Sequence, residues 1–262
     1  MKALLPCVIA TLLFASPVAA QSVFDGTWKG DIAASQLSTK PSVFAITKGR
    51  YTCSTCKPVL DVLADGAFHP VAGNPYYDEM SVTIIDPVTI KRAGRKGGKP
   101  AGSSTVTVSA DGKTLSNAFT DMTAANGVPV TGTDRSERVA AGPAGSHATS
   151  GSWRATNSGD ISDSGLTFAM AVEGKTVKYS SPTGVTYTAT IGGPAAPVTG
   201  DPGWTSATVT QPSPNTLVET DFHDGKTLAI YTMTVSPDGK TMTTKVDDIK
   251  YGKKSTLIAT KQ

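Results

Sequence analysis

Strong net charge, histidine, cysteine and long apolar runs are all scarce in this 262-residue sequence. It has 24 Lys and Arg against 21 Asp and Glu, and a formal charge of +3 is too weak to predict binding to nucleic acid or to an anionic membrane. Three scattered histidines do not make a metal centre. The sequence also lacks a nucleophile elbow, a phosphate-binding glycine loop and a metalloprotease helix motif. We therefore expect no metal, no cofactor and no nucleic-acid partner.

The one apolar run lies at the N-terminus. Met1-Lys2 is followed by an apolar stretch at 3–14 and then by the small residues ASPVAA at 15–20. A basic start, a short apolar core and a small-residue exit are typical of a secretory signal peptide, cut before Gln21. The run is too short to span a bilayer, so it predicts no membrane anchor. The sequence thus predicts an exported protein, periplasmic or secreted.

The rest of the chain is an internal repeat. The segment PVAGNP at 70–75 returns 127 positions later as PVTGDP at 197–202, and SADGKT at 109–114 returns as SPDGKT at 236–241. The match continues without a gap, with roughly a third of the positions identical, and self-similarity of this kind outranks local motifs in deciding a fold.

Glycine (26) and proline (17) are frequent, no helical period is convincing, and short Thr- and Val-rich runs alternate with turn dipeptides such as Asp-Gly. One helical turn is conceivable only at 33–38. The first repeat predicts strands at 26–33, 42–47, 50–53, 58–63, 80–85, 89–93, 103–109, 114–120 and 130–139. The second predicts strands at 151–155, 166–172, 176–180, 185–191, 206–210, 216–221, 227–235, 241–248 and 254–260.

This strand pattern predicts an all-β protein of two tandem antiparallel meander barrels. Closing a meander into a barrel removes both exposed sheet edges, and a barrel of about eight strands is either filled or able to hold one ligand. The small-residue segment beginning at Ala140 predicts a linker. We therefore expect a signal peptide at 1–20, a first barrel at 21–139, a linker at 140–148 and a second barrel at 149–262.

Each repeat opens its first strand with Gly-x-Trp and ends its last strand with a basic residue. The tryptophans are Trp28 and Trp153, and the basic residues are Arg138 and Lys261. This pattern resembles the lipocalin/calycin families, in which the tryptophan closes the barrel base and the basic residue stacks on it. A cation over an indole face is the physical reason. The whole mature chain also resembles a group of exported two-repeat bacterial proteins with lipocalin-like barrels and no established activity. An avidin-like barrel and a sandwich are alternative arrangements.

Cys53 and Cys56 occur only in the first repeat. In an exported protein two cysteines this close normally oxidise, so we predict a small disulfide that pins a turn. A thioredoxin-like redox role would need a helix after Cys53, and none is predicted. Lys57 departs from the haem-attachment pattern, which would need a histidine there, and a zinc site would need two further ligands.

A second feature found only in the first repeat is His69 with the run Tyr76-Tyr77-Asp78-Glu79. His69 beside Asp78 or Glu79 is a weak candidate for acid/base catalysis or metal binding, against the simpler interpretation of solvated loop residues. Tyr76 and Tyr77, with Trp204 in the second repeat, are candidates to line a pocket mouth.

Three function classes remain. The favoured one is a non-catalytic exported protein that binds or sequesters a small apolar or amphipathic molecule in a lipocalin-like barrel. The second is a hydrolase or isomerase that uses His69 with Asp78 or Glu79, and the third is a structural or adhesion module with filled barrels. Nothing in the sequence indicates an oligomeric state.

Overall fold

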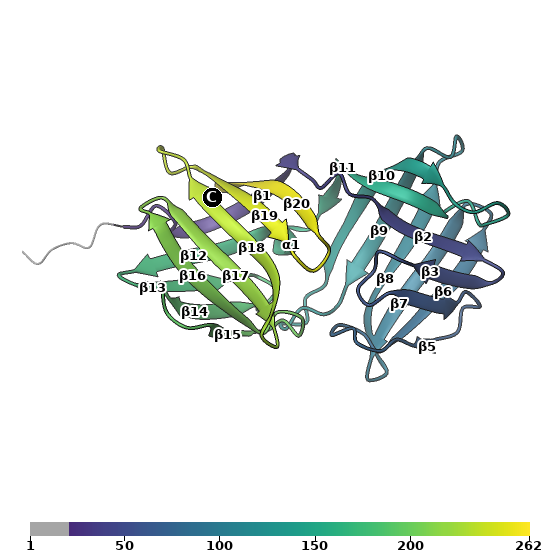
Figure 1. The fold of residues 1–262 in the computed structure, drawn as a ribbon, viewed down its shortest axis with the longest axis horizontal. Helices are drawn as coiled ribbons and strands as arrows, with labels where there is room; N and C mark the ends of the chain where they lie inside the picture. The colour runs from purple at the N-terminus through teal and green to yellow at the C-terminus, as the bar shows by residue number, and fades with distance from the viewer. Residues whose placement is uncertain (1–20) are drawn as a thin grey trace, which may run out of the picture.

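The computed structural model describes residues 21–262, so the predicted signal peptide lies outside the described residues. The described chain forms 20 strands and one four-residue helix, α1 (Asp163–Leu166). The strands make two ten-stranded antiparallel sheets, one closed into a barrel and one nearly closed (Figure 1). This confirms the predicted fold class. No helix in the described range is long and apolar enough to cross a membrane.

We call the nearly closed sheet barrel I. Its strands are β2 (Ser42–Thr47), β3 (Arg50–Cys53), β4 (Leu60–Leu63), β5 (His69–Pro70), β6 (Glu79–Asp86), β7 (Thr89–Lys96), β8 (Lys99–Val108), β9 (Thr114–Asp121), β10 (Val130–Ala141) and β11 (Gly151–Ile161). The spatial order is β4-β3-β2-β11-β10-β9-β8-β7-β6-β5. The β4–β5 loop spans the gap, where the amide of Gly66 donates to the Val82 carbonyl at 2.9 Å.

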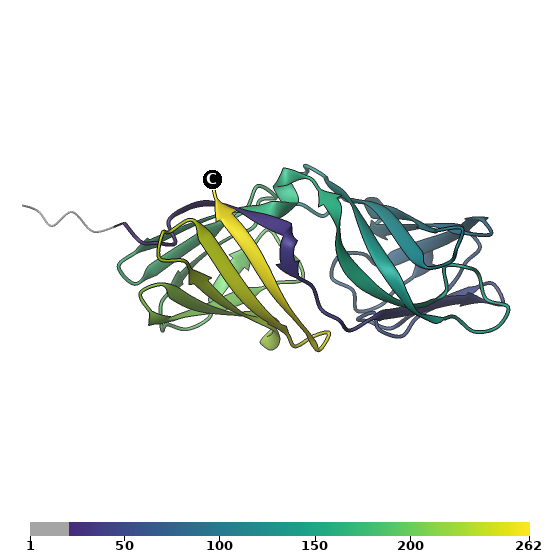
Figure 2. The ribbon, with the colours of Figure 1, turned by 90° about the horizontal axis from the view of Figure 1, so that it is seen from above.

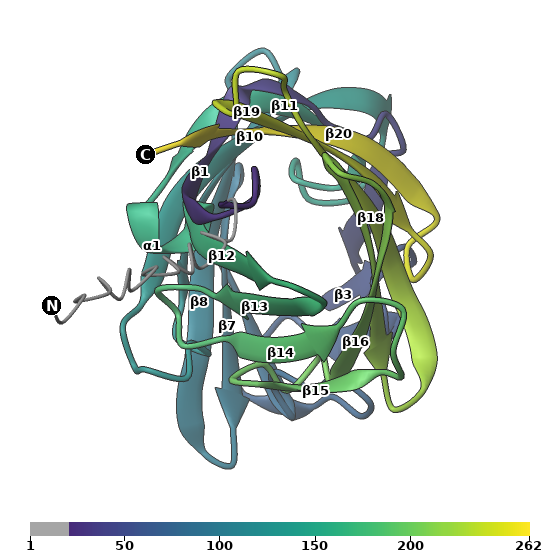
Figure 3. The ribbon, with the colours of Figure 1, turned by 90° about the vertical axis from the view of Figure 1, so that its left-hand side faces the viewer.

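We call the closed sheet barrel II. Its strands are β1 (Gly26–Gln36), β12 (Thr167–Glu173), β13 (Thr176–Ser180), β14 (Thr186–Thr190), β15 (Ala196–Thr199), β16 (Ser206–Ser213), β17 (Thr216–His223), β18 (Lys226–Val235), β19 (Thr241–Asp248) and β20 (Lys253–Lys261). They follow one another in this order around the barrel, and β1 closes the ring between β20 and β12 (Figure 3).

The two repeats exchange their first strands. β1 belongs to the first repeat but pairs with β12 and β20 of barrel II, whereas β11 belongs to the second repeat and pairs with β2 and β10 of barrel I. Seen from above, β1 leaves barrel II and the chain continues into β2 of barrel I (Figure 2). Barrel I is therefore the continuous range 42–161, inserted between β1 and β12.

The structure differs here from the predicted division at 21–139, 140–148 and 149–262. Both first strands carry the same Gly-x-Trp start, so the sequence offers no reason to assign either one to a particular barrel. The predicted linker at 140–148 covers the end of β10 and the turn that leads to β11 inside barrel I, and the two residues that follow it, Thr149 and Ser150, are buried. Ser150 Oγ accepts the Ile46 amide at 2.9 Å. The chain crosses between the barrels at 37–41 and 162–166 instead.

The strands follow the predicted ranges closely, and their inner faces alternate with period two, as in β17, where every second residue from Leu217 to Asp221 is buried. The repeated turns are built identically. Ser109 Oγ donates to Asp111 and accepts the Thr114 amide, and Ser236 does the same with Asp238 and Thr241, as distances of 2.6 and 3.0 Å in both turns show.

Three local predictions differ from the structure. Residues 33–36 continue β1 rather than forming a helical turn, and the one helix lies at 163–166. The short strands β5 and β15 were not predicted. Each contains the proline of the repeated PVxGxP segment, and proline is disfavoured in strands because it cannot donate a ladder hydrogen bond.

Candidate functional site

Trp28 closes one end of barrel II. Its side chain is fully buried, its indole N–H donates to the Phe24 carbonyl at 2.8 Å, and the Lys261 ammonium lies 5.0 Å from the ring centroid. Trp28 and Lys261 are direct partners in the β1–β20 register. The tryptophan and the cation therefore form a floor that keeps water out of this end.

Trp153 closes barrel I in the same way. Its indole N–H donates to the Thr149 carbonyl at 2.9 Å, and the Arg138 guanidinium carbon lies 4.0 Å from the ring centroid. Arg138 also donates to the carbonyls of Ser150 and Ala148 at 2.6 and 2.7 Å. Because the first strands are exchanged, each tryptophan meets the basic residue of the other repeat.

The opposite ends of the barrels face each other. The C-terminal ends of β1 and β11 meet where the Asn157 side-chain amide donates to the Ser35 carbonyl. Across the same junction the Tyr76 hydroxyl donates to Asp201 Oδ1 at 3.0 Å. Burial, together with the Asp201 charge, raises the pKa of Tyr76. The tryptophan-closed ends thus point outward, and the inner ends of both barrels lie at the junction.

Barrel II contains a cavity of about 380 Å³ on the junction side. Two buried acidic residues, Glu219 and Asp221, line it together with the exposed Asp31 and with aromatic and aliphatic side chains. The aromatic and aliphatic lining residues include Leu166, Phe168, Tyr179, Trp204, Tyr231 and Met233. A volume in this range suits a small organic molecule. The barrel is therefore hollow enough for a ligand, which a filled structural module would not be.

Glu219 and Asp221 are the buried acidic residues of this cavity. They lie two residues apart on β17, so both side chains point inward, and they are only 7% and 6% exposed. The Tyr187 hydroxyl donates to Glu219 Oε2. Asp221 Oδ1 has no hydrogen-bond partner among residues 21–262. The polar groups that act on the Asp221 carboxyl include Glu219 and Trp204. Burying a carboxylate oxygen at a cavity wall without a close hydrogen bond is costly.

Burial sets the protonation of this pair. It raises the pKa of Glu219, and it raises the pKa of Asp221 to about 9 with a further contribution from the charge of Glu219. Two carboxylates that share a desolvated site cannot both ionise without a counter-charge. The pair therefore holds at least one proton at neutral pH.

Aromatic rings form one wall of the same cavity. Tyr179 stacks on Tyr187 at a centroid distance of 5.2 Å and on Phe168 at 6.0 Å. Trp204 meets Tyr179 and Tyr187 edge-on at 5.8 and 5.7 Å. Such a cluster offers several π faces and edges next to the two carboxylates, an arrangement that suits a ligand with a flat or cationic group.

Barrel I has two adjoining cavities, of about 400 and 300 Å³, that share Tyr51, Cys56, Tyr77 and Arg92. Of the aromatic residues predicted to line a pocket mouth, Tyr76 and Tyr77 line the cavities of barrel I and Trp204 lines that of barrel II. The structure therefore does not bring the three together into one pocket.

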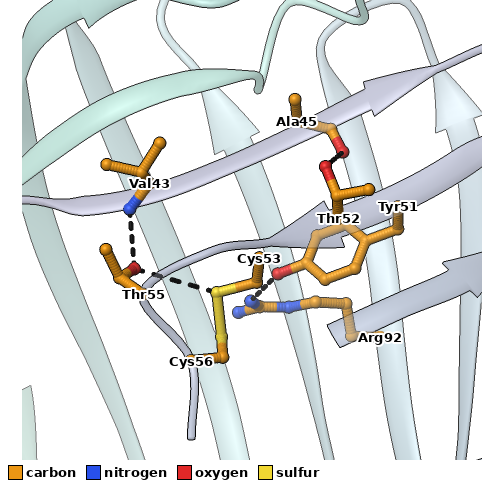
Figure 4. The surroundings of a disulfide bond; sticks show 8 residues. All are labelled: Val43, Ala45, Tyr51, Thr52, Cys53, Thr55, Cys56 and Arg92. Atoms are coloured by element: carbon orange, nitrogen blue, oxygen red, sulfur yellow. Dashed lines mark hydrogen bonds between the residues drawn. A yellow bond between two sulfur atoms is a disulfide. The ribbon is translucent and has the colours of Figure 1, made fainter. Parts of the chain in front are cut away.

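The two cysteines form a disulfide, Cys53–Cys56, at the end of β3 (Figure 4). Cys53 is buried, and Thr55 Oγ1 accepts the Val43 amide at 2.9 Å, which holds the loop against β2. No helix follows Cys53, so the pair lacks the helix N-terminus at which thioredoxin-like redox cysteines lie. The bond lies beside Tyr51 and Arg92 and forms part of the wall of barrel I.

His69 lies at the short strand β5. Its Nε2 is 2.8 Å from Asp65 Oδ1. The Asp78 carboxylate instead accepts the Gly97 amide at 3.0 Å, and Glu79 is on β6. Asp65 is about half exposed, and none of these four residues lines the cavities described above. The structure thus pairs His69 with a carboxylate other than those predicted.

Glu219, Asp221, Tyr179 and Tyr231 line the barrel II cavity but were not singled out from the sequence, nor was Tyr187, which contacts Glu219. The sequence does contain a pattern that indicates Glu219 and Asp221. Two acidic residues at i and i+2, following Leu217 on a strand, all point to one face, and charged residues on an inward face are rare without a role. Comparison with the first repeat, which has Arg92 and Gly94 at these positions, marks them as different between the barrels.

No model of a known protein family matches the chain, and no curated protein is similar to it. Within residues 21–262, no group of three or more His, Cys, Asp or Glu side chains is placed to hold a metal ion. The chemistry of the barrel II cavity is that of a buried carboxylate pair beside aromatic and aliphatic side chains.

Proposed function

We propose that this protein is a small-molecule-binding protein and that barrel II holds a small amphipathic cation against Glu219 and Asp221. The observation that carries the proposal is the unpartnered, buried Asp221 Oδ1 at the wall of a cavity of about 380 Å³. A ligand with a positively charged nitrogen would supply the counter-charge that this carboxylate pair lacks. Its apolar body would replace water against Leu166, Phe168 and Met233.

The aromatic wall favours a cation over a neutral hydrogen-bond donor. Trp204, Tyr179 and Tyr231 surround the cavity near the carboxylates, and indole and phenol faces attract alkylammonium groups. Aromatic cages are used in this way for quaternary ammonium ligands. The combination of π faces with an acidic pair thus selects for charge as well as for shape.

We also propose that the protein is exported and that it belongs with the lipocalin-like barrel proteins that it resembles. The N-terminal sequence pattern supports export, and the Cys53–Cys56 disulfide agrees with it because disulfides persist in oxidising compartments. The tryptophan floors with their stacked cations support the lipocalin resemblance.

Benzyltrimethylammonium tests the binding proposal because it carries a permanent charge and a flat apolar group. We expect it to bind, to shift the Trp204 indole signal in NMR, and to bind at least tenfold more weakly, about 1.4 kcal/mol, to the Asp221→Asn variant. Benzyl alcohol should bind weakly to both proteins. Affinity for the cation should rise from pH 6 towards pH 9 as the Asp221 proton becomes easier to remove.

Glu173→Gln is the matched control, since it removes one exposed carboxylate from an outer hairpin of barrel II. It should leave the affinity unchanged. Calorimetry in buffers of different ionisation enthalpy should show proton release on binding at pH 7. Equal affinity of the unaltered protein and Asp221→Asn for the cation, or no shift of the Trp204 signal at saturation, would refute the site.

A further inference from the structure

Arg92 is the residue of barrel I that corresponds to Glu219 of barrel II, 127 positions later in the repeat. It lies on β7 and lines both cavities of barrel I. Its Nε–H donates to Ser104 Oγ at 3.0 Å, and its two terminal nitrogens donate to the Tyr51 hydroxyl at 3.3 Å and to Asn117 Oδ1 at 3.4 Å. The charge at equivalent interior positions is therefore opposite in the two barrels.

The Arg92 guanidinium has only neutral protein acceptors. It forms no ion pair with a carboxylate anywhere in residues 21–262. The nearest acidic member of the network, Asp134, is reached through Asn117, whose amide donates to Asp134 Oδ2 at 2.7 Å. A guanidinium has five N–H donors, and three are used here. Two donors of a half-buried cation thus remain available to a bound group.

The surroundings of Arg92 add positive charge. The cavity of about 300 Å³ is lined by the basic residues Lys57, Arg92 and Lys253 and by one acidic residue, Asp134. Lys253 comes from β20 of barrel II, at the junction between the barrels. The cavity of about 400 Å³ adds Asp121 at its edge. Basic groups therefore predominate in the cavity that reaches the Trp153 floor.

We propose that barrel I binds a second small molecule, an amphipathic anion whose carboxylate or sulfonate is held by the guanidinium of Arg92. Arginine presents a planar fork of donors that matches such groups. The apolar body of the ligand would lie against Tyr77, Leu115 and the Phe44–Tyr51 pair, whose ring centroids are 5.8 Å apart. The site is separate from the cavity of barrel II, so either proposal can fail without the other.

The probe is 1-anilinonaphthalene-8-sulfonate, an amphipathic anion whose fluorescence rises in apolar surroundings. We expect saturable binding that weakens at least tenfold in Arg92→Gln and is partly retained in Arg92→Lys, which keeps the charge but not the fork. Arg154→Gln removes the same charge from the exposed outer wall of the same barrel and should bind the dye as the unaltered protein does.

A measurement on the unaltered protein covers the case in which Arg92→Gln fails to fold. In NMR the dye should shift the Nε–H signal of Arg92 and leave the indole signal of Trp204 in barrel II in place. Equal dye affinity in folded Arg92→Gln and in Arg154→Gln would overturn the proposal. A dye that shifts Trp204 but not Arg92 would overturn it as well, since the anion would then occupy barrel II.

Discussion

The two barrels share a scaffold and differ in what lines it. Both have ten strands, a tryptophan floor and the same Asp-Gly turns, yet Arg92 faces the interior of barrel I where Glu219 faces that of barrel II. Barrel I is nearly closed and carries a disulfide, whereas barrel II is fully closed and has none. The two repeats thus share the groups that hold each barrel together and differ at positions that line the cavities. Differences between the repeats are therefore the best guide to function.

The largest effect on stability is expected from removing a buried tryptophan, which tests which barrel that tryptophan stabilises. Trp28→Ala should lower the unfolding free energy of barrel II by about 3–5 kcal/mol, the usual cost of truncating a large buried aromatic side chain. Hydrogen exchange should accelerate at amides in 167–261 while those in 42–141 keep their protection. Loss of protection in 42–141 instead would contradict the strand exchange, because Trp28 belongs to the first repeat in sequence.

The acidic interior predicts a pH dependence that barrel I lacks. Asp221 has a folded-state pKa of about 9, above its ordinary value of 3.8, so the folded state binds the proton more tightly. The resulting stability is complete below about pH 4 and is lost as the pH rises towards 9. The unfolding free energy should fall by at most about 1.4 kcal/mol per pH unit, or about 3 kcal/mol between pH 6 and 8.

Asp221→Asn should reduce this slope in urea unfolding of barrel II, leaving only the part due to Glu219, and the variant should exceed the unaltered protein in stability at pH 8. Glu173→Gln, with its exposed side chain, should keep the slope. An unchanged slope in Asp221→Asn would show that the buried carboxylate is not the titrating group.

The disulfide should matter to barrel I alone. The double variant Cys53→Ser/Cys56→Ser removes a bond that closes a very short loop, which in the chain-entropy relation is worth about 2 kcal/mol. We expect barrel I to unfold at a lower urea concentration and barrel II to be unchanged. Hydrogen exchange at amides of each barrel measures the two separately. A weaker effect on folding together with unaltered dye binding would argue that the bond has no part in shaping the Arg92 cavity.

The smallest effect concerns the cations beneath the floors. Arg138 donates to several backbone carbonyls around Trp153, whereas the Lys261 ammonium donates to one, that of Val23, at 3.1 Å. Arg138→Lys should therefore cost barrel I about 1 kcal/mol, since charged hydrogen bonds are lost. Lys261→Arg should change barrel II by less than about 0.5 kcal/mol. Thermal unfolding of both variants measures the difference, and equal effects would contradict the asymmetry.

Local sequence signals predicted most of the architecture. The SADGKT and SPDGKT turns, the alternating Thr and Val runs and the Gly-x-Trp starts are short-range features, and each acts where it stands. The strand exchange could not be predicted in this way. Trp28 and Trp153 occupy equivalent positions at the closed ends of the two barrels. Which barrel each first strand joins therefore depends on the path of the connections at 37–41 and 162–166.

The candidate sites were predicted less well for a related reason. Tyr77 and Trp204 stand out in the sequence because aromatic residues are few, and both line cavities. Asp221 and Glu219 are ordinary residues in a polar strand, and only their common inward face makes them unusual. His69 attracted attention by its residue type, but its partner is Asp65, four residues away on the adjacent turn.

The position of β1 in barrel II also determines which barrel can form first during synthesis. All ten strands of barrel I have been synthesised once residue 161 is made, but β1 must wait for β20, which begins at Lys253, before both of its neighbours exist. The earliest strand is thus the last to be enclosed. A chain that stops short of β20 leaves Trp28 without its lysine and one edge of β1 unpaired, so the C-terminal strand completes a structure that the N-terminal strand began.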